Sequence, residues 1–203
     1  MPMYCPYTFG RLAEVVKSKG APIIERPNEI NIWGVRSNDL QSNAFNDWLT
    51  FSYRRDDGVF AFYAFQATTD AGLYWRQNPE NAKGVGVLVP GYYPGLWHRG
   101  LHRGQYPALV QTGPCDVWRD NNRDAVLDIG SATPIERGVK IGLNLHHARA
   151  VGASAQVDKW SAACQVVADA DDHAFVMTLV GRQISAGLPD NFGYVLLNER
   201  DVS

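Results

Sequence analysis

Cysteine is scarce in this sequence: the 203 residues include only three, Cys5, Cys115 and Cys164, and no two of them form a Cys-x-x-Cys pair. A disulfide framework needs paired cysteines, and a structural zinc site needs ligands at short spacings. Neither is therefore expected here, and we predict at least one free thiol.

A strong excess of charge is also missing. The 19 Lys and Arg residues nearly balance the 21 Asp and Glu residues, for a formal net charge of -2. The sequence thus lacks the basic footprint that binds nucleic acids and anionic membranes, and we expect no nucleic-acid partner.

Long apolar runs are missing as well. No segment approaches the length of a membrane span, and residues 1–7 do not combine a charged start with an apolar core. We therefore expect a protein that is cytoplasmic at synthesis, without a signal peptide and without stable membrane insertion.

Two segments carry helical patterns. Thr8 can cap a helix over 8–19, and a later helix is expected to have Asp171 or Asp172 as its cap and to end near Gly187. We treat the first as part of an N-terminal helical extension.

The rest of the chain is patterned mainly as β-strands. From residue 30 onward apolar residues recur with period two, and a turn at 54–58 joins two such runs into a predicted hairpin. Further strands are expected at 84–89, 108–111, 115–119, 139–146 and 192–197, and a turn and a loop at 90–95 and 97–106. We predict a mainly β, β-rich α+β fold with an extension at 1–29 and one domain at 30–203.

The most informative pattern is a histidine on a predicted strand, His146, followed eighteen residues later by Cys164. Leu143 and Leu145 alternate with Asn144 and His146, so a strand turns the leucines to the core and the polar pair to the other face. A neighbouring imidazole accepts the proton of a thiol and raises its reactive fraction. The alternative is a buried thiol and a core histidine that serve packing alone.

The residues just before Cys164 suit the same chemistry. Ser161 can hydrogen-bond an imidazole or a substrate carbonyl, or simply hold a turn. Trp160 is either a core side chain or a wall of a substrate cleft. The backbone amides of Ala163 and Cys164 are expected to stabilise a tetrahedral oxyanion, where one donor contributes about 3 kcal/mol. We expect neither a cofactor nor a metal.

The glycine-rich run at 97–106 contains two histidines and two arginines. Its side chains, His102 and Arg103 among them, suit the binding of substrate carboxylates, although an ordinary charged surface loop has the same composition. His98 and His102 are poor candidates for a metal site, since no acidic or cysteine ligand lies at a suitable spacing.

A run of acidic and amide residues at 120–128 matches the first part of a calcium-binding loop. Its candidate ligands are Asp120, Asn122, Asp124 and Asp128. Ala125 stands where such loops need glycine, which favours a solvated turn but leaves a structural cation open.

The residues around His146 and Cys164 resemble the L,D-transpeptidases of the YkuD type, in which His-Gly on a strand precedes Ser-His-Gly-Cys by some sixteen residues. His146, Ser161 and Cys164 match the histidine, serine and nucleophile of that motif. Residues 89–92 resemble the Thr-Pro-x-Gly-x-Tyr region of the family, which makes Tyr92 a candidate for substrate binding. The resemblance covers about residues 59–168 and implies a mixed β-sandwich or barrel as the catalytic domain.

The departures from the family motif fall on substrate-binding positions. Ala162 and Ala163 replace His-Gly, His147 replaces the glycine after the histidine, and Val166 stands where the family has an arginine. The family's carboxylate anchor is therefore missing, and we include His147 among the substrate-binding candidates.

A closer resemblance is to small proteins of phages and prophages that form a divergent branch of this group. It rests on the segments 67–72, 119–124, 144–148 and 160–166. It implies an endolysin-like role in host lysis, with holin-dependent release into the periplasm or cell wall.

These residues together predict a peptidoglycan peptidase that cleaves the stem peptide through a Cys164 acyl-enzyme. His146 would activate the thiol and protonate the leaving amine, while Asn144 would orient the ring or bind peptide. The alternatives are a transpeptidase that cross-links peptidoglycan and a non-catalytic wall-binding or virion protein.

Overall fold

The computed structural model describes residues 4–41 and 43–203 and has the mainly β, α+β architecture that the alternating pattern predicts. The elements in chain order are α1 (Phe9–Ser18), β1 (Ile30–Arg36), β2 (Asp47–Arg54), β3 (Phe60–Thr68), α2 (Leu73–Gln77), β4 (Val85–Leu88), β5 (Gly91–His102), β6 (Tyr106–Gln111), β7 (Cys115–Asp120), β8 (Ile135–Val139), β9 (Leu145–His147), β10 (Gln165–Val167), α3 (Ala170–Ser185), β11 (Phe192–Asn198) and α4 (Glu199–Val202).

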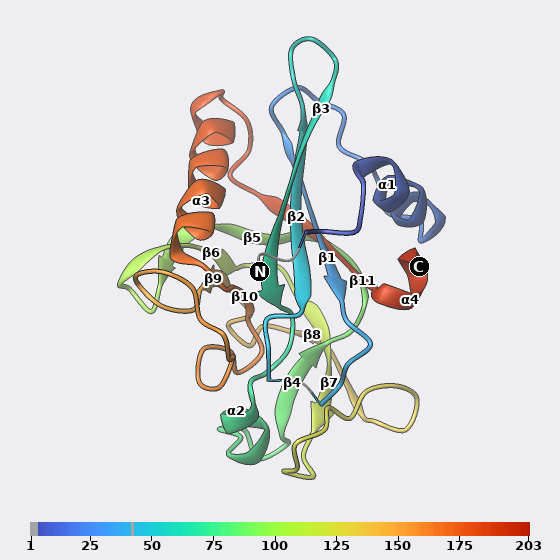
Figure 1. Cartoon of the computed structure of the whole chain (residues 1–203), viewed down its shortest axis with the longest axis vertical. Coiled ribbons are helices and arrows are strands. Elements are labelled where there is room, and N and C mark those ends of the chain that lie inside the picture. The colour runs from blue at the N-terminus through green and yellow to red at the C-terminus, as the bar shows by residue number, and fades with distance from the viewer. Residues whose placement is uncertain (1–3, 42) are drawn as a thin grey trace.

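Eight of the strands close into a barrel in the order β1-β11-β5-β6-β9-β10-β3-β2, and β4, β7 and β8 form a separate sheet in the order β4-β7-β8. Two neighbouring pairs in the barrel, β1 with β11 and β9 with β10, run parallel. Figure 1 shows α3 along one side of the barrel, α1 and α4 on the opposite side, and the small sheet at its foot with α2.

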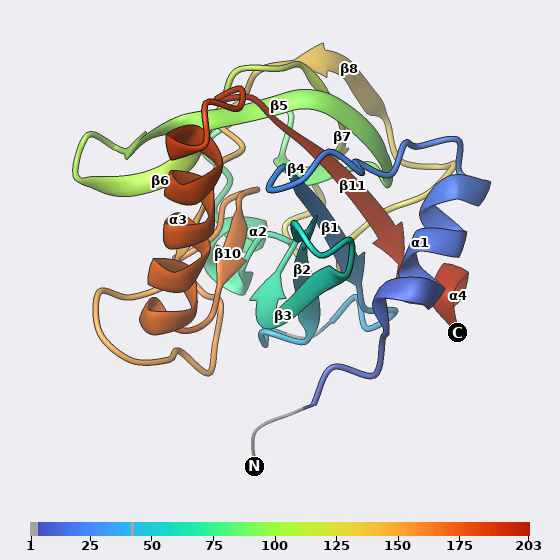
Figure 2. The ribbon, with the colours of Figure 1, turned by 90° about the horizontal axis from the view of Figure 1, so that it is seen from above.

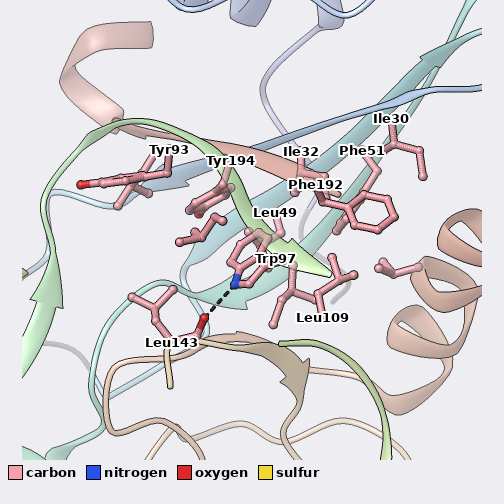
Figure 3. Packing of buried hydrophobic residues seen from close by; sticks show 14 of the residues in the cluster. Ile30, Ile32, Leu49, Phe51, Tyr93, Trp97, Leu109, Leu143, Phe192 and Tyr194 are labelled. Atoms are coloured by element: carbon pink, nitrogen blue, oxygen red, sulfur yellow. Dashed lines mark hydrogen bonds between the residues drawn. The ribbon is translucent and has the colours of Figure 1, made fainter. Parts of the chain in front are cut away.

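The barrel is filled by large apolar side chains from both the early and the late strands (Figure 3). Leu143 and Leu145 are fully buried in this core, which confirms the face predicted for them. The indole Nε1 of Trp97 donates to the carbonyl oxygen of Leu143 at 2.7 Å. This bond ties the segment before β9, where the candidate site begins, to the centre of the barrel.

The helix α1 packs against the outside of the barrel. The Thr8 side chain accepts a hydrogen bond from the backbone of Arg11, as an N-cap should. Leu12 and Val16 are fully buried and share a cluster with residues of β1, β2 and β11, such as Trp33. Within the predicted extension at 1–29, residues 1–3 lie outside the described residues.

The late helix α3 starts at Ala170, and its cap is Asp169, which accepts from the backbone of Asp171 and lies two residues before the earlier of the two predicted caps. Its buried face, including Val176 and Val180, closes over the barrel core. Figure 2 shows α3 and α1 at opposite ends of the barrel. Among the helices of residues 4–41 and 43–203, none has the length and apolarity needed to cross a bilayer.

The predictions for 90–95 and 97–106 were wrong, because these residues form the long strand β5 and its hairpin with β6. Glycines and Pro94 interrupt the apolar alternation, yet Gly95 accommodates a φ of +59° without leaving the sheet. The hairpin turns at Arg103 and Gly104, with φ of +49° and +73°. The predicted strand at 139–146 is in fact broken between β8 and β9, where Gly142 has a φ of +75°.

Candidate active site

The parallel pairing of β9 with β10 brings Cys164 and His146 to the same face of the barrel wall. Val166 pairs with His146, and the backbone of Gln165 donates to the carbonyl oxygen of Asn144 at 2.9 Å. Because side chains alternate along a strand, Asn144 and His146 share a face with Cys164 and Val166. The register therefore places the imidazole and the thiol on one face of the barrel wall.

Gln165 points the other way, into the barrel, and anchors β10 there. The Tyr194 hydroxyl donates to Gln165 Oε1 at 2.7 Å, and Gln165 Nε2 donates to the Thr69 carbonyl oxygen at 3.4 Å. A buried residue with both amide groups bonded fixes the orientation of its strand. The neighbouring thiol is thereby held on the outer face.

Cys164 opens into a groove of about 600 Å³. The walls come from α2 and the residues after it, from the start of β4, from the hairpin turn at 102–103, from 140–144 and from 162–164. Cys164 is half-buried, with Sγ 3.4 Å from the Gly142 carbonyl oxygen, to which it donates, and 3.5 Å from the Asn144 backbone nitrogen. Burial raises the pKa of this thiol to about 11, so it is protonated at rest.

His146 is buried, 3% exposed, and held in one tautomer. Its Nδ1 lies 2.8 Å from the His147 carbonyl oxygen and 3.2 Å from the Tyr106 hydroxyl. Because a carbonyl only accepts, we assign the proton to Nδ1, which leaves the lone pair on Nε2. Burial, and secondly the neighbouring His102, lowers the pKa of His146 to about 3. The ring is therefore a neutral base.

His102 lies over His146 and lines the groove, whereas His146 does not. Gln111 donates its backbone N–H to Asn144 Oδ1, which identifies the other amide atom, 3.2 Å from His102 Nδ1, as the donor Nδ2. His102 therefore carries its proton on Nε2. In the described part of the chain, no hydrogen bond joins the Cys164 thiol to His146 or His102.

The turn before Cys164 offers free hydrogen-bond donors. Within residues 4–41 and 43–203, the backbone N–H groups of Ala163 and Cys164 donate to no protein atom. Ser161 is fully buried and its hydroxyl donates to the Cys164 carbonyl oxygen at 2.8 Å, while its own carbonyl accepts from Gly72. Ser161 therefore holds the turn, and the two free N–H groups are available to a negatively charged oxygen.

The groove carries more positive than negative side chains. Arg103, Arg119 and Lys140 line it with one carboxylate, Glu80. Arg119 is paired with Glu136 at 2.6 Å, whereas Arg103 and Lys140 form no ion pair among the described residues. The groove thus suits a substrate with carboxylates.

Three of the candidates lie elsewhere. His147 stacks on Tyr106, with ring centroids 4.1 Å apart, on the face opposite to His146. Trp160 is 43% exposed and does not line the groove. Tyr92 borders two other hollows, of about 260 and 400 Å³, that do not contain Cys164. The structure thus gathers Asn144, His102, Arg103 and Ala163 around the nucleophile, but not these three.

Sequence reasoning missed several groove residues. Trp75 takes the place expected for Trp160, and its Nε1 donates to the Lys159 carbonyl oxygen at 3.0 Å. Tyr106 does not line the groove but contacts His146, and it lies in the run at 97–106, whose composition had already indicated a binding segment. Lys140 lies only six residues before His146, but its contribution depends on the break between β8 and β9.

The acidic run at 120–128 folds on itself. Asn122 Nδ2 donates to Asp124 and to Asp128, each at 2.9 Å. The residues that the structure describes contain no cluster of three His, Cys, Asp or Glu side chains suited to a metal ion. The observed bonds are those of an Asx-rich turn.

Comparison of the chain with protein-family models, with curated proteins and with solved structures found no match. The fold and the site define a β-barrel protein with a half-buried thiol, a neutral imidazole and free amides around a cationic groove.

Proposed function

We propose that the protein is a cysteine-dependent peptidase that cleaves the stem peptide of peptidoglycan. The observation that carries this proposal is the position of Cys164, which lies in the groove beside two unused N–H groups and on the same face as His146. A nucleophile, a base and an oxyanion site are the three parts that acyl transfer requires.

In the proposed reaction, Cys164 Sγ attacks the peptide carbonyl while its proton passes to His146 Nε2. The pKa of about 11 for the thiol and of about 3 for the imidazole disfavour a resting ion pair, so the proton moves as the C–S bond forms. The amides of Ala163 and Cys164 stabilise the resulting oxyanion.

The imidazolium of His146 then donates its proton to the leaving amine, and the C–N bond breaks to leave a thioester on Cys164. Water attacks this thioester and gives a proton to His146, which returns it to the departing sulfur. The products are an amine, a carboxylic acid and the free enzyme. His102 covers His146 on the groove side and keeps solvent away from the base.

Two observations favour the stem peptide as the substrate. The cations Arg103 and Lys140 suit its free carboxylates, and they stand in for the arginine that the family motif has where this chain has Val166. The resemblance to phage proteins favours hydrolysis in the cell wall after release during lysis. A transpeptidase uses the same thioester and differs only in taking an amine in place of water.

The proposal is tested by incubating the protein with purified peptidoglycan and analysing the released muropeptides by mass spectrometry. The parent should release shortened stem peptides, and Cys164→Ser should release none. Cys5→Ser is the matched control, because Cys5 is also half-buried but lies outside the groove, and it should behave as the parent does. Unchanged muropeptides with the parent would refute the proposal.

One observation favours a second candidate, a non-catalytic protein that binds the cell wall. The thiol is held protonated by its burial and is not hydrogen-bonded to an imidazole among the described residues. Such a protein would sediment with peptidoglycan, would release no products, and would keep its affinity as Cys164→Ala.

A further inference from the structure

The strand β4 is an edge of the three-stranded sheet and forms part of the groove wall. Among the strands of the described residues, β4 pairs with β7 alone. Gly84, Val85 and Gly86 line the groove with Cys164. An edge strand presents backbone N–H and C=O groups along its open side, and those without a partner can bind another chain.

The register of β4 with β7 shows which of the backbone groups of β4 are free. Val89 donates its backbone N–H to the carbonyl oxygen of Asp116, and this pair continues the antiparallel register of β4 with β7. Hydrogen-bonded pairs alternate along an antiparallel ladder, so Val85 and Val87 bond to β7, whereas Gly86 points its N–H and C=O away from it. The Arg119 backbone, opposite Gly86, donates to Pro134 on the far side, as this alternation requires.

The outward groups on either side of Gly86 are already used at Gly84, whose carbonyl accepts from Arg119 at 3.4 Å, and at the Leu88 carbonyl. The Gly84 N–H donates to the Asn81 carbonyl oxygen, and the Leu88 carbonyl accepts from Arg36 at 2.7 Å. In the described ranges 4–41 and 43–203, no bond beyond the β4–β7 ladder engages the backbone of Gly86. One donor and one acceptor thus remain open at this single residue.

Gly86 also lies next to the turn that carries the nucleophile. A Cβ built on it would be 3.7 Å from the Cβ of Ala163 and 2.9 Å from Cδ1 of Ile141. A glycine without positive φ at a groove wall is typical of a place where another backbone approaches closely.

We propose that the backbone of Gly86 binds one residue of an extended peptide substrate through a pair of hydrogen bonds and so presents the scissile carbonyl to Cys164. The inference rests on the proposed function and deepens it. The substrate must contain a peptide backbone in extended form, as in other cases of strand addition. The N–H and C=O of a sugar N-acetyl group belong to one planar amide and point in opposite directions, so they cannot meet both groups of Gly86.

The test measures binding without turnover, using full-length protein with Cys164→Ala. Its probes are the peptidoglycan stem tetrapeptide and analogues of it that are methylated on one backbone nitrogen at a time. Methylation at the nitrogen that faces the Gly86 carbonyl should weaken binding about tenfold, and methylation elsewhere should have little effect. In parallel, NMR spectra should show that addition of the unmethylated tetrapeptide shifts the Gly86 amide signal and slows hydrogen–deuterium exchange of that amide.

Gly86→Ala in the same background should also lose about tenfold in affinity, because the added methyl group enters the narrow space between Ala163 and Ile141. Gly181→Ala on α3, where an added Cβ meets no atom within 4 Å, is the matched control and should bind as the parent does. Near-ultraviolet circular dichroism of both variants should match that of the parent.

The outcomes separate this inference from the proposed function. A position-specific effect of methylation with no release of muropeptides would support the Gly86 site and refute the peptidase. Suppose that muropeptides are released, that all methylated peptides bind with the same affinity, and that the Gly86 amide signal does not shift. This result would refute the Gly86 site but not the peptidase. Failure of the tetrapeptide to bind would overturn the inference.

Discussion

The imidazole rings of His102 and His146 stack with centroids 3.9 Å apart and planes inclined by 25°. One ring faces the groove and the other is buried behind it, and each is held in a different tautomer by a different partner. Because two adjacent cations repel, the pair takes up one proton far more readily than two. His102, which belongs to β5, therefore lowers the pKa of His146, the base of the proposed reaction, which belongs to β9.

Replacing His102 by Phe should keep the stacked ring and remove its charge. Burial of His146 would remain but repulsion from His102 would be lost, so the pKa of His146 should rise from about 3. The acid limb of kcat/KM should move to higher pH, and NMR titration of the His146 ring should show the same shift. An unchanged titration would mean that His102 only packs.

Alkylation of Cys164 by iodoacetamide should be slow at pH 7 and should accelerate about tenfold per pH unit up to about 11, because only the thiolate reacts and burial raises the pKa of the thiol. Mass spectrometry of the labelled peptides measures this profile. Cys115, which is 2% exposed, should stay unlabelled until the protein is unfolded. Rapid labelling of Cys164 at pH 7 would show a resting thiolate instead.

Acid should destabilise the protein through its histidines. Burial lowers the pKa of His173 to about 4 from an ordinary 6.5, so below pH 6.5 the unfolded chain binds a proton that the folded protein does not. Stability is present above pH 6.5 and is lost as the pH falls toward 4, by about 3 kcal/mol for this residue. His173→Phe should flatten this dependence in urea unfolding measured at pH 7 and pH 4. An equally steep dependence in the variant would contradict the assignment.

Arg103→Asn should stabilise the hairpin of β5 and β6 and lower the affinity of the groove for its substrate. Arg103 has a φ of +49°, a conformation that Asn adopts more readily, so the melting temperature should rise by about 2 °C. Loss of the guanidinium should weaken binding of the stem tetrapeptide about tenfold. Arg99→Gln, on the same hairpin but outside the groove lining, is the charge control and should leave affinity unchanged.

Ser161→Ala should destabilise the turn before Cys164 without changing the reactivity of the Cys164 thiol. The Cys164 carbonyl would lose its donor, at a cost of about 1 to 2 kcal/mol in the free energy of unfolding. Displacement of the amides after Ser161 should lower kcat about tenfold, while the alkylation profile of Cys164 should stay the same. A larger effect on labelling than on kcat would place the hydroxyl at the nucleophile itself.

Local patterns in the sequence were enough to predict much of the fold. Thr8 marks the start of α1, and the alternation of Leu143 and Leu145 gives the face of His146. Local patterns failed for β5, because its glycines and Pro94 interrupt the apolar alternation. The strand is stabilised by its pairing with β6 and β11.

The candidate site could be predicted only where it depends on neighbours in sequence. Cys164, His146 and Asn144 lie on one face because of two short strands, and the motif indicates this. The stack of His102 on His146 and the open backbone of Gly86 arise from pairing between distant strands, which no local pattern encodes. Tyr92 was expected in the site because it resembles a family position, yet it borders other hollows.

The parallel arrangement of β9 and β10 has a consequence for how such a protein can vary. Residues 148–164 return the chain to the same end of the barrel wall, and a loop of that kind tolerates a change of length at small entropic cost. A slip of one residue in the pairing would instead turn the sulfur inward to the hydrocarbon interior. Evolution is thus free to lengthen the gap between the two reactive groups, but not to shift one strand past the other.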